Sequence, residues 1–334
     1  EVLDALDHPA TMADYQALMV EHSDKYRRSL ILCPAGHAKS ESFSKLNIIR
    51  HICWNPNVRI ILTTSTAEDA SDYCKSIEAE LTGNKKLVED FGPFYNPNNW
   101  TSTGFRVIGC QHNNPHDTLE TFGTGSYKQK GHGCEICVLD DVVTDDTSLT
   151  PEARRKQLAW FRMAVQTGPR PMWRIDKRYG LMVPKGIDWP MDAPYNPRPG
   201  DDKYGQLMVP GTPFHPKDLY WSLDEDDTFH TLHLDCWTDK EETKPLWDGF
   251  WTNEALHAER ESMGFVNFNK RYRCSPMDES EMTFLREWFE GDESVNPTIL
   301  DSCEISVHFS GTAEGKSMAK EGGSCIYLAP DFVA

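Results

Sequence analysis

Lys39 and Ser40 stand directly after a short turn that follows an apolar run, in the stretch "ILCPAGHAKSES" (31–42). This layout is typical of a phosphate-binding loop, in which a lysine and a serine or threonine open a helix after a glycine-rich turn. Ala38 stands where that pattern has glycine, so the loop has lost one. Lys39 would neutralise the β- and γ-phosphates of a nucleotide, and the Ser40 hydroxyl would ligate Mg²⁺.

The same turn contains further residues that we assign to nucleotide binding. Gly36 permits an unusual backbone angle, and Ala38 is small enough to let a phosphate approach if its own angles are allowed. His37 and Glu41 complete the predicted nucleotide-binding loop. Taken alone, the stretch is also compatible with an ordinary strand-to-helix turn that contains Lys-Ser by chance.

Two acids, Asp140 and Asp141, end a second apolar run, "ICVLDD". A phosphate-loop ATPase needs one acid at the end of a neighbouring strand to hold Mg²⁺ through water, and a second to orient the attacking water. Asp140 suits the first role and Asp141 the second. The alternative is a polar strand end followed by an acidic turn, because Asp145 and Asp146 follow closely.

A third stretch, "VPGTPFHPKDLYW" (209–221), predicts a strand that ends at Gly211 and Thr212. Thr212 at this place can form a hydrogen bond near the γ-phosphate, and that bond would change when the γ-phosphate is lost. Gly211 and Thr212 are therefore a candidate motif for coupling nucleotide state to movement. A proline-rich turn is the alternative.

These residues require a sheet that brings strand ends together. Apolar runs predict strands, and the stretches between them predict helices; the strands are 29–33, 58–65, 104–110, 134–141 and 205–214, and the helices 40–54, 66–83 and 151–165. Continuous apolar strands separated by helices indicate a mostly parallel sheet covered on both faces. Residues 168–203 predict irregular structure, 246–290 predict helices with polar faces, and strand-like patterning resumes after about residue 300.

Composition excludes several classes of protein. The 334 residues are 39% hydrophobic and 26% charged, as in a folded globular protein. A formal net charge of −18 argues against a surface coated with basic residues, although a local basic channel is still compatible with it. No run of about 18 apolar residues predicts a membrane span, and no signal peptide is expected. The chain begins at Glu1, so we expect a trimmed N-terminus.

The ten cysteines do not predict a metal site. Cys134 and Cys137 form a CxxC pair, but they lie in an apolar strand and no second pair with zinc spacing follows. We expect buried, reduced thiols of the kind found in the cytosol.

The order of these motifs resembles that of the large terminase subunit of tailed bacteriophages, the motor that packages DNA into procapsids. The resemblance covers most of the chain and is strongest in the segment from 246 to 276, "LWDGFWTNEALHAERESMGFVNFNKRYRCSP". "ADYQ" (13–16) resembles the motif whose glutamine, Gln16, reads adenine. "CPAGHAKS" resembles the family's Walker A motif, "ICVLDD" its Walker B motif and "GTPFHPKDLY" its coupling motif.

The resemblance implies an α/β fold of the P-loop NTPase type (ASCE, or RecA-like) with a small helical linker subdomain. It places the ATPase core at 1–245, the linker at 246–300 and the start of an RNase H-like nuclease at 301–334. It implies ATP and Mg²⁺ as cofactors and double-stranded DNA, a portal protein and a small terminase subunit as partners. The motor would form a homo-oligomeric ring on the procapsid in the host cytoplasm, with no membrane partner.

The sequence departs from the family at four places. Ala35 stands where the family usually has arginine in Walker A, and Asp141 replaces the usual glutamate of Walker B. Lys130 stands at the place of an arginine finger that reaches the ATP of a neighbouring subunit, although a solvated loop lysine is equally compatible. Ser310 replaces the first metal-binding acid of the nuclease, and the chain stops soon afterwards, so we do not expect this chain to cut DNA.

Two other functions stay open at this stage. Another P-loop DNA enzyme such as a helicase would share the nucleotide motifs but lack the 246–276 segment. A degenerate, non-catalytic subunit that binds nucleotide or DNA would explain the lost glycine, but Lys39, Ser40, Asp140 and Asp141 argue against it.

Overall fold

The computed structural model describes residues 12–110, 117–165 and 205–277, and the backbone of four short strands outside these ranges. The chain divides into two units, Glu1–Asp278 and Glu279–Ala334. In the second unit only the antiparallel pair β11 (Cys303–Ser306) and β12 (Tyr327–Pro330) is described. The predicted start of a nuclease domain, including Ser310, otherwise lies outside the described residues.

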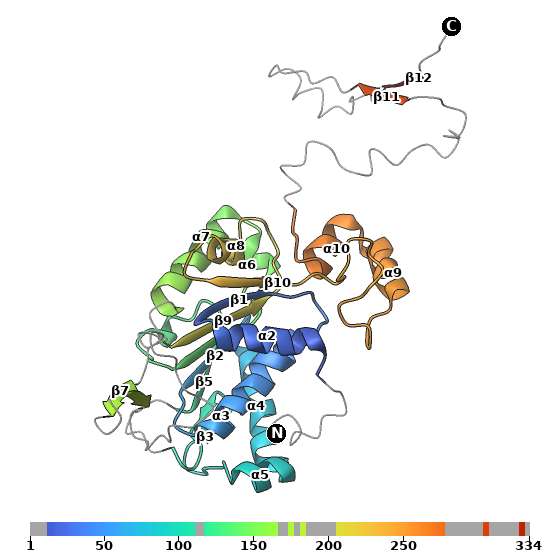
Figure 1. Ribbon diagram of the computed structural model, residues 1–334. Coiled ribbons are helices and arrows are strands. Elements are labelled where there is room, and N and C mark those ends of the chain that lie inside the picture. The colour runs from blue at the N-terminus through green and yellow to red at the C-terminus, as the bar shows by residue number, and fades with distance from the viewer. Residues whose placement is uncertain are drawn as a thin grey trace. The chain divides into compact units, whose positions relative to one another are not determined.

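An eight-stranded sheet forms the centre of the first unit, in the order β10-β1-β9-β6-β2-β5-β4-β3 (Figure 1). The six strands from β10 to β5 are parallel to their neighbours, and β4 and β3 continue the sheet antiparallel at one edge. Their bounds are β1 Arg28–Leu32, β2 Ile60–Thr64, β3 Trp100–Thr101, β4 Gly104–Phe105, β5 Leu119–Gly123, β6 Ile136–Leu139, β9 Gln206–Gly211 and β10 His230–His233.

Side chains of the central strands are buried on both faces of the sheet. Ile31, Leu62 and Val138 belong to one core cluster, whereas their neighbours Leu32 and Leu139 belong to the other. Successive side chains of a strand point to opposite faces, so a continuous apolar run is required when both faces are covered. This is why the apolar runs around residues 31, 62 and 138 could be predicted as strands.

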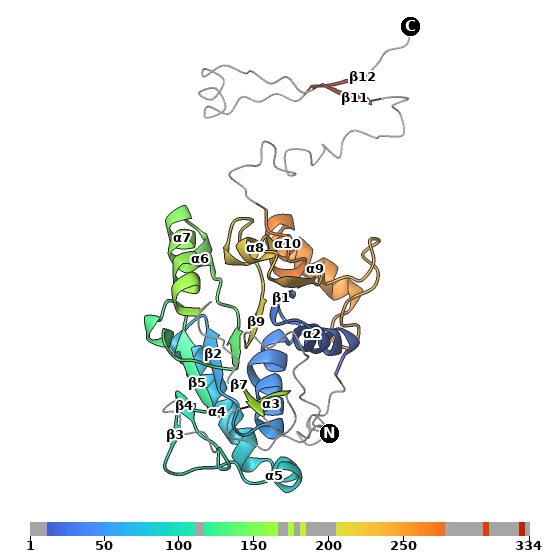
Figure 2. The same cartoon turned by 60° about the vertical axis from the view of Figure 1, so that its left-hand side comes forward.

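Helices cover both faces, as Figures 1 and 2 show. The first core cluster is closed by α2 (Asp14–Lys25), the π-helix η1 (Glu41–Asn47), α3 (Ile48–Trp54), α4 (Ala67–Gly83) and α5 (Lys85–Phe91). The second is closed by α7 (Pro151–Trp160), the π-helical turn η3 (Phe161–Val165) and α8 (Leu219–Asp224). The short helices η2 (Tyr127–Gln129) and α6 (Asp145–Ser148) follow β5 and β6.

The strand order identifies the fold class. The strand β1 leads into the lysine-containing loop, β6 ends at the paired acids, and β9 lies between them, hydrogen-bonded to both. Insertion of a strand between these two is the arrangement of the ASCE class of P-loop NTPases. The predicted mostly parallel α/β sheet of this type, flanked by helices, is therefore confirmed.

Two parts of the sheet differ from the prediction. The apolar run 104–110 forms only the short antiparallel strand β4, and the parallel position beside β2 belongs to β5. The segment of β5, "LETFG", alternates buried and half-buried residues and has too few apolar residues to stand out. The edge strand β10 was also missed, because "HTLH" leaves its histidines exposed.

A separate two-stranded sheet lies within residues 168–203, which were predicted to be irregular. Its strands β7 (Trp173–Asp176) and β8 (Leu181–Pro184) pair antiparallel.

The segment after β10 forms a small helical subdomain within the first unit. Thr252 caps α9 (Asn253–Met263) by accepting the N–H of Ala255, and Gly264 separates it from α10 (Phe265–Tyr272). The two helices have their own apolar cluster, which includes Trp237, Leu256 and Phe268. The last residues of α10 contact the loop that follows β1, because the Arg271 carbonyl accepts the N–H of Ala35.

Candidate nucleotide-binding site

The loop after β1 has a strained backbone at the residues that would face a phosphate. Gly36 has φ +70° and Ala38 has φ +51°, both in the left-handed region. Glycine adopts this region freely, whereas an alanine there costs roughly 1–2 kcal/mol. Ala38 is therefore held in a glycine-like conformation by the surrounding fold, and the loop keeps the shape that the missing glycine would have adopted.

Lys39 follows Ala38 and points to the acids at the end of β6. Its ammonium lies 2.5 Å from the Asp141 carboxylate, and the Lys39 side chain is 8% exposed. Burial alone would lower the pKa of Lys39, but the nearby charges of Asp141 and Asp140 raise it above its ordinary value. Lys39 is therefore fully protonated at neutral pH, as a phosphate-binding lysine must be.

Asp140 is 2% exposed and only partly satisfied. Ser44 donates a hydrogen bond to Oδ2 at 2.6 Å, whereas the buried Oδ1 has no hydrogen-bond partner among the described residues. Burial and the charge of Asp141 raise the pKa of Asp140 to about 6, against the lowering effects of Lys39 and Ser44. A buried carboxylate oxygen without a partner is the donor that a hard cation accepts.

The oxygen donors present fit Mg²⁺ bound together with a nucleotide. Within the described residues, no group of three or more His, Cys, Asp or Glu side chains could hold a metal ion alone. Mg²⁺ commonly takes only one or two protein ligands and completes its shell with phosphate oxygens and water. Ser40 and Asp140 would be those ligands.

Asp141 connects the acid strand to the segment after β9. Its backbone is left-handed, with φ +48°, a conformation that aspartate tolerates better than most residues. The N–H of Thr212 donates to Asp141 Oδ1 at 3.2 Å, and the Thr212 hydroxyl donates to the Cys33 carbonyl at 2.9 Å. Thr212 thus bonds both to the strand that ends at the acids and to the start of the loop.

Gly211 is required beside Thr212 for steric reasons. A Cβ on Gly211 would lie 2.1 Å from the hydroxyl oxygen of the fully buried Tyr220. The Gly211 carbonyl also accepts the Cys33 N–H at 3.1 Å, which extends the pairing of β9 with β1 to the beginning of the loop. The segment predicted to couple nucleotide state to movement is therefore bonded directly to the phosphate-binding loop.

A cavity of about 940 Å³ lies at the carboxyl ends of these strands, where ligands bind in open α/β sheets. It is lined by Ala35, Gly36, His37, Ala38, Lys39, Ser40, Glu41, Ser65, Tyr73, Asp141, Val143, Thr144, Asp145, Thr212, Phe214, Met263, Asn267, Lys270 and Arg271. A smaller cavity of about 430 Å³ includes Ser40 together with Asp140 and Asp141. The predicted loop, acids and coupling threonine thus line two cavities that share Ser40 and Asp141.

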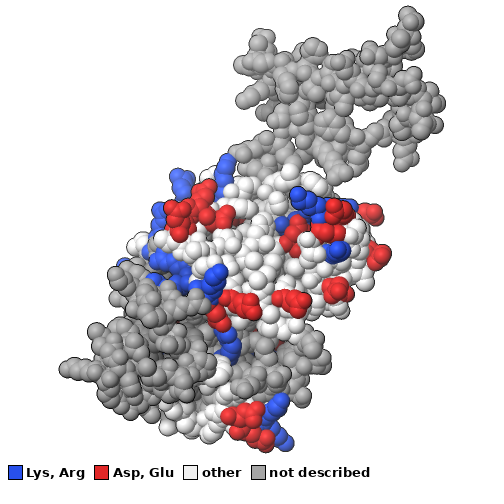
Figure 3. Space-filling view, in the orientation of Figure 1, with Lys and Arg blue, Asp and Glu red and all other residues white. Residues whose placement is uncertain are grey.

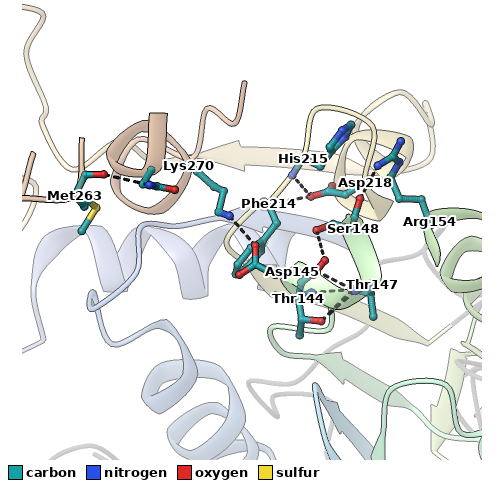
Figure 4. Close-up of polar contacts among 11 residues, drawn as sticks. Thr144, Asp145, Thr147, Ser148, Arg154, Phe214, His215, Asp218, Met263 and Lys270 are labelled. Atoms are coloured by element: carbon teal, nitrogen blue, oxygen red, sulfur yellow. Dashed lines mark hydrogen bonds and ion pairs between the residues drawn. The ribbon is translucent and has the colours of Figure 1, made fainter. Parts of the chain in front are cut away.

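Residues of the helical subdomain also line the larger cavity and were not predicted from the sequence; they are Met263, Asn267, Lys270 and Arg271. Lys270 of α10 reaches the Asp145 carboxylate at 2.7 Å and lies 4.9 Å from the centre of the Phe214 ring (Figure 4). The Arg271 carbonyl accepts the N–H of Ala35 at 2.8 Å. The 246–276 segment stood out in the sequence, but nothing in it indicated which residues face the site.

Aromatic side chains bind the same subdomain to the loop. The Trp251 indole N–H donates to the Gly36 carbonyl at 3.4 Å, and a Cβ on Gly36 would come within 3.3 Å of the Trp251 ring. The ring of His37 stacks with that of Trp251 at 6.0 Å, and the Tyr15 hydroxyl donates to the His37 carbonyl. Burial lowers the pKa of His37, so this ring is neutral at pH 7.

Four predicted site residues do not line the larger cavity: Asp140, which lines the smaller one, Gly211, which precedes Thr212, and the two residues Gln16 and Lys130. Gln16 lies on α2 next to Tyr15, and its carboxamide oxygen accepts the N–H of Ala13 at 2.9 Å. Lys130 follows η2 and is exposed. Glu41 does line the cavity and forms an ion pair with Lys45 at 3.0 Å. The roles assigned to Gln16 and Lys130 stay predictions.

The described surface carries both signs of charge. On the face shown in Figure 3, acidic and basic side chains lie close together in several groups, with uncharged surface between them. In the described part of the chain, no helix combines the length and the apolar character that crossing a membrane requires.

Comparison with known proteins gives similarity in structure but not in sequence. No protein-family model matches the chain, and no curated protein sequence matches it. The solved structures to which it is similar include the large terminase ATPase domain of Thermus phage P74-26, at 12% identity and a TM-score of 0.49, over 82% of this chain and 97% of that one. Another is the large terminase of a thermophilic bacteriophage in complex with ATP-γ-S, at 10% identity and a TM-score of 0.41, over 78% and 52% of the two chains.

Proposed function

We propose that this chain is the ATPase of a phage large terminase, which hydrolyses ATP to move double-stranded DNA into a procapsid. The observation that carries the proposal is the convergence of Lys39, Ser40, Asp141 and Thr212 on one cavity at the carboxyl edge of the sheet. The order of the sequence motifs and the distinctive 246–276 segment supply the terminase part of the proposal.

Nucleotide binding would displace the internal ion pair of the site. The triphosphate enters between the loop and the acids, and Lys39 exchanges the Asp141 carboxylate for phosphate oxygens. The backbone amides of the loop and the start of the following helix add donors for the phosphates. Exchange of one anion for another keeps the buried ammonium paired throughout, which limits the cost of desolvation.

Hydrolysis would then use the acid that Lys39 has released. Asp141 orients a water molecule toward the γ-phosphate and accepts its proton, while the Thr212 N–H holds the carboxylate in place. Ser40 and Asp140 would hold Mg²⁺, which supplies charge neutralisation on the β- and γ-phosphate oxygens.

Loss of the γ-phosphate would be transmitted along two sets of contacts. Thr212 bonds both Asp141 and the carbonyl of Cys33, so a change at the acid reaches the loop. The loop in turn is bonded to the helical subdomain through Gly36 with Trp251. We propose that the subdomain moves on these contacts and pulls DNA.

The assembly is part of the same proposal. The motor would work as a homo-oligomeric ring on a portal protein, supplied with DNA by a small terminase subunit, in the host cytoplasm and transiently on the procapsid. The exposed position of Lys130 is compatible with a finger that acts on a neighbouring subunit.

ATP turnover of the purified chain, with and without double-stranded DNA, tests the proposal. We expect Mg²⁺-dependent hydrolysis that DNA stimulates and that Lys39→Ala abolishes. Hydrolysis accompanied by unwinding of a duplex would identify a helicase instead. A chain that binds ATP-γ-S but never turns over ATP, alone or on a portal template, would be a non-catalytic subunit.

A further inference from the structure

Among the described residues, the charged side chains that line the cavity have ion-pair partners, with the exception of one cation. Lys39 pairs with Asp141, Lys270 with Asp145, and the remaining lining acid, Glu41, pairs with Lys45 at 3.0 Å. Arg271 also lines the cavity, is exposed, and makes no side-chain hydrogen bond or ion pair within the described residues. Among the described residues, Arg271 is therefore a lining cation for which no anionic partner is found.

The backbone at Arg271 is fixed to the loop that would hold the phosphates. Its carbonyl accepts the Ala35 N–H at 2.8 Å, one residue before the left-handed Gly36. Asn267 lies four residues before Arg271, on the same face of α10, and it lines the same cavity. Lys270, the residue directly before Arg271, also lines the cavity. The backbone of Arg271 is thus held next to the loop, and its exposed side chain starts from that position.

We propose that Arg271 binds the phosphate chain of the nucleotide and acts in the same subunit as the loop that it contacts. A triphosphate brings several negative charges into the cavity. In the proposed mechanism Lys39 exchanges Asp141 for phosphate, whereas Lys270 is paired with Asp145, so a second basic side chain at the phosphates would offset more of this charge. The planar guanidinium suits this role because it contacts two phosphate oxygens at once. The inference rests on the proposed nucleotide site and adds a phosphate ligand from the helical subdomain.

This contact would give the subdomain a direct response to nucleotide state. Among the described residues, two other polar contacts join the subdomain to the loop. They are made by the Arg271 carbonyl and the Trp251 indole N–H, and neither contact involves a nucleotide. A bond from the Arg271 side chain forms only when phosphate is bound, so it makes the position of α10 depend on the ligand.

Equilibrium titrations with ATP-γ-S and with inorganic tripolyphosphate test the proposal. Arg271→Ala should weaken both ligands by a similar factor of about tenfold or more, the range for a lost hydrogen bond to a charged group. Arg271→Lys should recover part of the loss. Arg155→Ala is the matched control, because Arg155 is an exposed arginine on α7 that does not line the cavity.

The two ligands separate a phosphate contact from a contact with the base. A loss for ATP-γ-S without a loss for tripolyphosphate would mean that Arg271 packs on the nucleoside, and it would overturn the proposal. Equal affinities of Arg271→Ala and Arg155→Ala would do the same. Because the carbonyl, not the side chain, holds the loop, Arg271→Ala should fold, and Arg271→Gln gives a second test at similar side-chain length.

Lys39→Ala distinguishes failure of this inference from failure of the proposed function. If Lys39→Ala loses tripolyphosphate binding while Arg271→Ala keeps it, the nucleotide site stands and only the role of Arg271 is wrong. If the parent chain binds neither ligand, or Lys39→Ala binds both like the parent, the nucleotide site itself is wrong and the inference falls with it.

Discussion

The Lys39 ammonium lies 2.5 Å from the Asp141 carboxylate, so the loop after β1 and the acid strand β6 neutralise each other across the cavity. In the proposed mechanism this pair has to open before Lys39 can hold phosphate and before Asp141 can hold water. We therefore expect the two residues to have opposite effects on nucleotide binding, although the mechanism uses both in turnover.

Asp141→Asn should separate binding from hydrolysis. Without the carboxylate, Lys39 is free for phosphate, so affinity for ATP-γ-S should equal or exceed that of the parent chain while single-turnover hydrolysis is lost. Lys39→Ala should lose both. Asp146→Asn, an exposed acid outside the cavity, controls for the change in charge. Parental turnover in Asp141→Asn would exclude its assigned role.

Asp140→Asn should remove Mg²⁺-dependent hydrolysis and stabilise the protein in the absence of metal. The substitution removes a buried negative charge whose Oδ1 has no partner among the described residues. Thermal unfolding without metal should occur at a higher temperature than in the parent. The addition of Mg²⁺ and ADP should raise the melting temperature of the parent and leave that of Asp140→Asn nearly unchanged. Equal stabilisation of both proteins by Mg²⁺ and ADP would show that Asp140 holds no metal.

Ala38→Gly should keep or increase the free energy of unfolding. Relief of the left-handed alanine contributes roughly 1–2 kcal/mol, and the more flexible unfolded chain removes roughly 0.4–1 kcal/mol. The net effect should be about 0–1.6 kcal/mol of stabilisation in denaturant unfolding. Ala159→Gly, in the exposed helical position of α7, should instead cost about 1 kcal/mol. If both glycines destabilise equally, the left-handed angle of Ala38 is not present in solution.

Lys130→Ala should remove the rise of specific ATPase activity with protein concentration while nucleotide affinity stays nearly unchanged. A finger acts mainly on the transition state of a neighbouring subunit. Lys130→Arg should preserve or increase the activity, because the guanidinium contacts two oxygens. Mixing Lys130→Ala with Lys39→Ala protein should partly restore turnover if the finger acts between subunits. Parental activity of Lys130→Ala at every concentration would identify a surface lysine.

His51 should contribute a loss of stability as the pH decreases from 7 to 5. Burial, with a further contribution from Arg50, lowers the pKa of His51 well below its ordinary value. The unfolded state, with a pKa of about 6.5, then binds the proton first, so stability is complete above that pH and is lost below it. His51→Gln should reduce the slope by up to about 1.4 kcal/mol per pH unit in denaturant unfolding between pH 6 and 5. An unchanged slope would show that His51 is protonated in the folded state.

The sequence alone determined the central fold and the chemical groups of the candidate site. Strands such as β1 and β6 are buried on both faces, so their residues have to be continuously apolar, and a short window of sequence suffices to find them. Lys39, Ser40, Asp140 and Asp141 stand directly beside those strands. Parallel strands end at the same edge of a sheet, which is why these groups could be expected to meet.

Only the tertiary structure decided which residues close the site from the other side. Arg271, Lys270 and Trp251 lie on a subdomain far along the chain, and their contacts with the loop depend on how α9 and α10 pack, which no local pattern encodes. The identity of the third strand was likewise decided by packing, because "LETFG" of β5 is supported by its neighbour β2 and not by its own composition. The left-handed backbone angle of Ala38 also depends on packing. Alanine disfavours this angle, and the contacts of the surrounding structure stabilise it.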